Sequence, residues 1–125
     1  MGIEDPFDAP DRPLAVIGVH GGAIATSSVR NRRWRTSDGR AVHHLIDPRT
    51  GEPGGAGLTA VTVAHRDPAW AEVWSKTLFL AGAEAIRDEA RSRDLPAWWV
   101  DEDGGLSMTP RARQASVWID EARVA

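Results

Sequence analysis

The first candidate for a catalytic residue in this sequence is a histidine. His44 falls within residues 40–46, which have the pattern of a β-strand. A neutral imidazole can accept a proton near pH 7, so His44 is a candidate general base. His43 is predicted to point away from it, because neighbouring side chains alternate along a strand. The two histidines are therefore not expected to bind a metal together.

A shaped loop follows this histidine. In the run from Asp47 to Gly51, aspartate can accept hydrogen bonds from downstream amides, proline fixes φ, and glycine permits positive φ. Such a run forms a turn in many proteins, and it can also present amides and hydroxyls to a ligand. Asp47 and Thr50 are the candidate binding residues in this loop.

A charged pair lies on the helix predicted to follow. Asp67 and Pro68 are typical of a helix start, and Gly82 is typical of a helix end. Glu72 and Lys76 are four residues apart, so they share one helical face. The simplest interpretation is an exposed ion pair, worth about 0.2–0.5 kcal/mol.

The apolar residues of this helix recur at helical spacing and predict its buried face. They are Trp70, Val73, Trp74, Thr77, Leu78 and Ala81. Trp70 and Trp74 could offer a stacking surface to an aromatic ligand. Aromatic residues at this spacing are more often core, so we expect both to be buried.

The order of the elements predicts an α+β fold. Strands are expected over residues 14–20, 23–27, 31–36, 40–46, 58–64, 95–100 and 106–109, and a second helix over 83–93. We predict a single domain over residues 1–125, with a mainly antiparallel sheet and two helices packed on one side of it. Residues 1–13 are proline-rich and lack apolar periodicity, so they are expected to be an arm or loop. The tail from residue 110 is compatible with a short helix or with a strand.

Composition excludes several classes of protein. The chain has 18 acids and 15 bases, and its net charge of −3 argues against nucleic-acid binding. Without cysteine there is no disulfide, thiolate nucleophile or cysteine metal site. No apolar run approaches the ~20 residues of a membrane helix and no signal peptide is visible, so we expect a cytoplasmic protein without a membrane span. The sequence also lacks a P-loop, a His-Glu-x-x-His helix and a Gly-x-Ser-x-Gly elbow.

Three segments together resemble the FAD:protein FMN transferases, the ApbE-like family. They are Ala25-Thr26-Ser27, the run from His44 to Gly51, and the strand-to-helix unit over residues 59–79. The likeness covers residues 3–108 and corresponds to the C-terminal half of a typical family member. It implies cleavage of the FAD pyrophosphate, transfer of FMN through its phosphate to a Thr or Ser hydroxyl of a target flavoprotein, and release of AMP, with magnesium assisting.

The resemblance also implies roles for individual residues. His44 falls on the family's histidine, which acts as a base or contacts phosphate. Thr26, Ser27, Asp47 and Thr50 match positions of the site that binds FAD. The glycine that commonly follows the Ala-Thr-Ser motif is a serine in this chain.

Glu72 and Lys76 occupy the positions where the family has an Asp and a Thr that help to bind magnesium. Glutamate keeps the carboxylate, but an ammonium has no oxygen lone pair to donate and repels a cation. Three interpretations stay open: Glu72 binds magnesium, the lysine charge partly replaces the metal, or the two residues form a surface pair.

The family places much of its flavin pocket upstream of the region matched here. The chain is then a fragment, the product of a misassigned start, or one half of a split enzyme that needs an N-terminal half as partner. The leading hypothesis is the C-terminal portion of an FMN transferase acting on FAD and an acceptor flavoprotein. The alternative is a non-catalytic domain that has kept the fold for flavin or protein binding. A small metallohydrolase using His44 and Glu72 is a third possibility.

Overall fold

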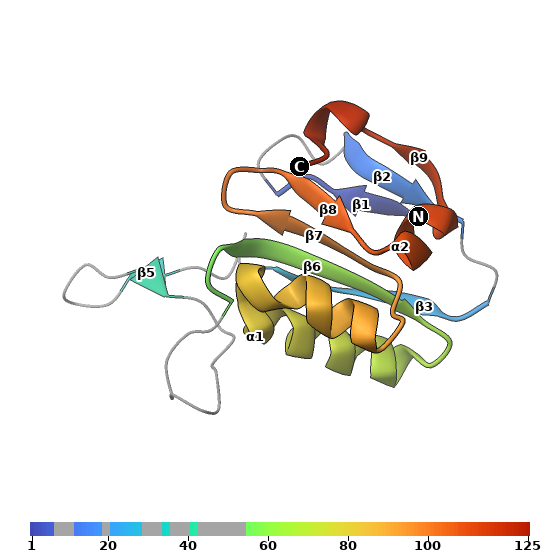
Figure 1. Cartoon of the computed structure of the whole chain (residues 1–125), viewed down its shortest axis with the longest axis horizontal. Helices are drawn as coiled ribbons and strands as arrows, with labels where there is room; N and C mark the ends of the chain where they lie inside the picture. The colour runs from blue at the N-terminus through green and yellow to red at the C-terminus, as the bar shows by residue number, and fades with distance from the viewer. Residues whose placement is uncertain (7–11, 19–20, 29–33, 36–40, 43–54) are drawn as a thin grey trace.

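The computed structural model describes residues 1–6, 12–18, 21–28, 34–35, 41–42 and 55–125 (Figure 1). Its strands are β1 (Gly2–Glu4), β2 (Pro13–Ile17), β3 (Ala23–Ser28), β4 (Trp34–Arg35), β5 (Ala41–Val42), β6 (Leu58–His65), β7 (Ala97–Asp101), β8 (Leu106–Met108) and β9 (Ser116–Ile119). Its helices are α1 (Pro68–Ser92) and α2 (Pro110–Ala115), and a short 3-10 turn spans Glu121–Arg123. Over this part of the chain, no helix combines the length and apolar character needed to cross a membrane.

The strands form two main sheets and a small hairpin. A central four-stranded sheet has the order β3-β6-β7-β8, and a three-stranded sheet has the order β1-β2-β9. β4 pairs with β5, as the predicted hairpin requires, and every pairing between these strands is antiparallel. The predicted α+β fold with a mainly antiparallel sheet is confirmed.

The middle strands β6 and β7 of the central sheet are buried on both faces, and neighbouring side chains on each strand point to opposite sides. Trp99 packs with Val61 and Val63 beneath α1. Trp98 points the other way, into a cluster that includes Leu14 from the three-stranded sheet. The molecule is therefore layered, with α1 on one face of the central sheet and the smaller sheet on the other (Figure 1).

α1 consists of two helical halves that meet at Gly82. This residue has φ 83° and ψ 169°, which is far from helical geometry and is favoured by glycine. The guanidinium of Arg93 lies 4.9 Å from the ring centroid of Trp74, so the second half folds back along the first. At the start of the helix, the Asp67 side chain accepts a hydrogen bond from the amide of Ala69 at 2.9 Å. The two predicted helices and the side of the sheet they cover are thus confirmed.

The predicted buried face of the first half is partly wrong. Trp70 and Val73 are 50% and 47% exposed, and Trp70 stacks on Trp74 with ring centroids 5.9 Å apart. The buried residues of this half are Ala71, Ser75, Leu78 and Phe79, of which Leu78 alone belongs to the predicted set. Small residues at the first two of these positions let the helix approach the sheet closely, whereas large indoles would hold it away.

The prediction of an arm or loop over residues 1–13 is wrong for Gly2–Glu4, which form β1. This strand pairs with β2, and its central residue Ile3 is only 5% exposed. Three residues are too few for apolar periodicity to reveal a strand, and the pairing partner determines the structure instead. Residues 7–11 lie outside the described residues. In the tail, both predicted possibilities occur in succession, as α2 and then β9.

A long-range ion pair joins the two ends of the described chain. Arg123 donates to the Asp5 carboxylate at 2.6 Å, and the Asp5 side chain is only 3% exposed. Arg123 also donates to the carbonyl of Gly104 at 2.9 Å, so the guanidinium connects three segments of the chain. This pair therefore holds the segment after β1 against the C-terminal turn.

We predict that Arg123→Met lowers the free energy of unfolding by about 2 kcal/mol or more, because it removes a cation that is bonded to a buried carboxylate. Arg113→Met is the matched control. Arg113 pairs with Glu121 at 3.1 Å, but both side chains are about half exposed or more. An exposed pair of this kind contributes about 0.2–1 kcal/mol. Urea unfolding of both variants makes the comparison, and equal losses would contradict a structural role for the Asp5–Arg123 pair.

Candidate functional site

The predicted site residues divide between the sheet, α1 and the connection from β3 to β6. His44, Asp47 and Thr50 lie in that connection, outside the described residues. The connection leaves the sheet at Ser28 and returns near Gly55. Because Ser28 pairs with Ala60, its two ends are attached at the same end of the central sheet.

The return of this connection is packed tightly against α1. Gly55 has φ +80°, and a Cβ at this position would lie 2.1 Å from the ring of Phe79. The amide of Ala83 donates to the carbonyl of Ala56 at 2.8 Å, just after the fold-back at Gly82. Gly55 is therefore required both by its backbone conformation and by the space available, and it fixes the end of the connection on the helix.

Thr26 and Ser27 match adjacent positions of one motif, but the pleat of β3 sends their side chains to opposite faces. Thr26 is exposed, and its Oγ1 lies 2.8 Å from Oγ1 of Thr62. Ser27 is 5% exposed, and its Oγ lies 3.0 Å from Oγ of Ser75 on α1. Thr26 thus faces solvent on the side of the sheet away from α1, and Ser27 fixes α1 to the sheet.

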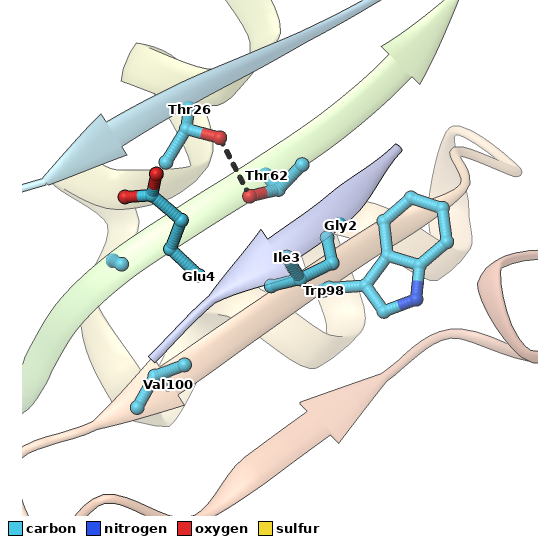
Figure 2. A pocket seen from close by; sticks show the side chains of 8 residues that line it. Gly2, Ile3, Glu4, Thr26, Thr62, Trp98 and Val100 are labelled. Atoms are coloured by element: carbon cyan, nitrogen blue, oxygen red, sulfur yellow. Dashed lines mark hydrogen bonds between the residues drawn. The ribbon is translucent and has the colours of Figure 1, made fainter. Parts of the chain in front are cut away.

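A groove lies beside Thr26, between β1 and the face of β3 and β6; we call it the β1–β3 groove. Its volume is about 260 Å³, and it is lined by Gly2, Ile3, Glu4, Thr26, Ala60, Thr62, Trp98 and Val100. Figure 2 shows the Glu4 side chain extending toward Thr26 across the opening. Pockets for small ligands usually measure ~300–1,000 Å³, so this groove on its own is small for a dinucleotide.

Glu72 and Lys76 form an ion pair on the outer face of α1. Lys76 Nζ lies 3.2 Å from Glu72 Oε1, and the two side chains are 49% and 55% exposed, respectively. The surface pair expected from their spacing is thus present. Among the described residues, no group of three or more His, Asp or Glu side chains could hold a metal ion. Magnesium is usually bound through one or two carboxylates together with water and substrate phosphates, so Glu72 could supply one oxygen donor and would need others beside it.

Two hydroxyl partners were not predicted from the sequence. Thr62 on β6 meets Thr26, and Ser75 on α1 meets Ser27. A signal for Ser75 does exist, because it lies four residues after Ala71 and extends a stripe of small residues along the helix. The signal for Thr62 requires the register of β3 against β6, which the sequence alone does not give.

Comparison with known proteins identifies this arrangement. Residues 1–99 match the sequence model of the ApbE family. The chain is 30% identical over 104 residues to the FAD:protein FMN transferase of Escherichia coli (strain K12). This match covers 83% of this chain and 29% of that relative. It is also 30% identical over 126 residues to the FAD:protein FMN transferase of Treponema pallidum (strain Nichols). That match covers 99% of this chain and 33% of the relative.

Solved structures agree. The ApbE protein of Thermotoga maritima matches with a TM-score of 0.80 and 26% identity, over 94% of this chain and 38% of that one. The apo flavinyl transferase ApbE of Pseudomonas stutzeri matches with a TM-score of 0.63 and 28% identity, over 74% of this chain and 30% of that one. The fold is thus shared with flavin transferases. The chain belongs to the ApbE family, as its three motifs indicate, and it spans about a third of the length of the curated relatives it matches.

The two serines between β3 and α1 give an unequal pair of predictions. Ser75 donates its hydroxyl proton to the carbonyl of Glu72 at 2.9 Å, so the proton between the two serines comes from Ser27. We expect Ser75→Ala to cost about 1–3 kcal/mol, because it leaves a buried donor unsatisfied. Ser27→Ala should cost about 1 kcal/mol or less, since it keeps the bond from Ser75 to Glu72. Denaturant unfolding measures both, and a larger loss in Ser27→Ala would contradict this direction of donation.

Proposed function

We propose that this chain supplies the C-terminal part of an FAD:protein FMN transferase. In the reaction, a Thr or Ser hydroxyl of a target flavoprotein attacks the FMN phosphorus of FAD, and AMP leaves. The observation that carries the proposal is the match of 94% of the chain to the ApbE protein of Thermotoga maritima at a TM-score of 0.80. The names of the Escherichia coli and Treponema pallidum relatives give the activity.

His44 is the proposed general base. It takes the proton from the acceptor hydroxyl as the new P–O bond forms and the P–O bond to the AMP phosphate breaks. This role needs an imidazole beside a bound phosphate. The attachment of both ends of the β3–β6 connection at one end of the sheet supports a defined place for it.

The remaining proposed binding residues position the FAD substrate. Asp47 and Thr50 shape the loop after His44 and present its amides and hydroxyl to the phosphates. Thr26 contributes from the exposed side of β3. The Ser27 hydroxyl is satisfied by Ser75, so its contribution is to hold β3, which leads into the connection carrying His44.

Glu72 is the proposed metal residue, since it stands at the family's acidic position on α1. Magnesium would neutralise charge on the diphosphate there, with Glu72 as one oxygen ligand and water or phosphate oxygens among the others. Lys76 already places a positive charge 3.2 Å from the Glu72 carboxylate. We propose that this ammonium supplies part of the charge compensation that a transferred phosphate requires.

A second candidate function is a non-catalytic domain that has kept the fold to bind flavin or protein. The observation that favours it is Lys76, which stands where the family has an oxygen donor and forms an ion pair with the Glu72 carboxylate. The acceptor flavoprotein and an N-terminal half are the partners that the enzymatic function requires. Activity measured with those partners separates the two functions.

Substitution of His44 tests the proposed general base. We expect His44→Ala to slow FMN transfer by about 10²–10⁴-fold, the usual contribution of a general base. The chain is mixed with FAD, magnesium, an acceptor peptide and an N-terminal half from a family member, and mass spectrometry follows covalent FMN on the peptide. His43→Ala is the matched control, because its side chain is predicted to lie on the opposite strand face. If both variants matched the parent chain, the role of His44 would be wrong.

Substitution of Lys76 tests the proposed charge compensation. Replacing the ammonium by a hydroxyl in Lys76→Thr removes a charge that repels cations and adds an oxygen donor. We expect the transfer rate of this variant to rise more steeply with magnesium concentration than that of the parent chain. Lys76→Arg keeps the positive charge and should leave the magnesium response unchanged. Identical magnesium responses in all three proteins would show that the pair is a surface feature without a part in the reaction.

A further inference from the structure

The first strand leaves one edge of its sheet unpaired by any described residue. β1 is an outer strand of the sheet with the order β1-β2-β9. Met1 and Ile17 exchange both main-chain hydrogen bonds, at 3.1 and 2.7 Å. Because bonding alternates along an antiparallel pair, the N–H and C=O of Gly2 point away from β2 and toward this edge. They are placed to bond another strand.

The space next to this edge is the β1–β3 groove. Its walls combine the hydroxyls of Thr26 and Thr62 with the apolar side chains of Trp98 and Val100. A strand laid beside β1 would cross over β3 and β6 and close this space (Figure 2). A strand suits such a mixed wall, because its side chains alternate between two faces.

The other outer strands differ from β1. The outer edge of β8 is occupied by the C-terminus, through a bridge between Leu106 and Val124 and a 2.9 Å bond from the Ala125 amide to Leu106. β9 ends the same sheet as β1, but its residues are not among those that line the groove. β3, the outer strand of the central sheet, lines the groove through Thr26, whereas β1 lines it with three consecutive residues, Gly2, Ile3 and Glu4.

We propose that this edge of β1, which no described residue pairs, receives a β-strand from the polypeptide that forms the rest of the transferase, extending the three-stranded sheet across the groove. The inference rests on the proposed function. The occupant follows from length, since the curated relatives are about three times as long as their match to this chain. It also follows from chemistry: the edge offers main-chain groups, which recognise an extended backbone, and the groove is small for a dinucleotide.

The absence of cysteine makes the test specific, because one introduced thiol reports on one position. Glu4→Cys reports on β1, and Val117→Cys is the control on the opposite edge strand of the same sheet; both positions are exposed. The probe is the part of the Escherichia coli relative that precedes its match to this chain. That probe is first shown to bind the remainder of its own protein.

With the probe added, alkylation of Glu4→Cys should slow by about tenfold or more, while that of Val117→Cys stays within about twofold. In the unsubstituted chain, hydrogen exchange of the Gly2 amide should slow by about tenfold or more, because that amide becomes bonded. The second measurement needs no variant. It also separates strand pairing from simple covering of the groove.

Four results would overturn the inference. They are failure of the competent probe to bind, protection of Val117→Cys in place of Glu4→Cys, thiol protection without slower Gly2 exchange, and equally slowed Gly2 exchange produced by FAD alone or by a higher concentration of this chain alone. FMN transfer in the same mixture tests the proposed function separately. Protection of β1 without FMN transfer would refute the proposed transferase function and support strand binding at β1. FMN transfer without protection of β1 would support the transferase function and refute strand binding.

Discussion

The fold depends on the alternation of side chains along β6 and β7, which makes the central sheet apolar on both faces. Trp98 and Trp99 are neighbours in sequence, yet one packs against the smaller sheet and the other beneath α1. A sheet of this kind must be covered twice to remove its apolar surface from water. The two coverings differ in kind: a folded-back helix covers one face, and a three-stranded sheet covers the other. The groove opens where the second covering ends.

Local sequence signals were sufficient to predict the elements whose ends are marked by a capping residue, a proline or a glycine. Asp67 and Pro68 begin α1 and Gly82 divides it, because capping, proline and positive φ act within a few residues. The buried face of α1 was predicted less well. Helical spacing defines several stripes, and the sheet selects the one with small residues. β1 could not be predicted, since its three residues are held by β2 and by an ion pair between Asp5 and Arg123, 118 residues apart.

The same contrast holds for the candidate site. The motifs around Thr26 and His44 indicated the family, because a motif is a local pattern and the ApbE match confirms it. The partners of those residues are distant in sequence. Thr26 meets Thr62 through strand register, and Ser27 meets Ser75 through helix packing. One motif thus contributes the exposed hydroxyl of Thr26 and the buried hydroxyl of Ser27, which attaches β3 to α1. This division follows from the pleat of β3 once its pairing is known.

The close contact between Gly55 and Phe79 joins two segments that would otherwise move separately. The Ala56 carbonyl is bonded just beyond the helix fold-back, so neither segment can leave its place without breaking apolar packing and a main-chain bond together. Segments connected in this way open as one cooperative unit. Melting of α1 would therefore also release Gly55 and Ala56, so the entry into β6 is held by the helix as well as by its own strand pairing.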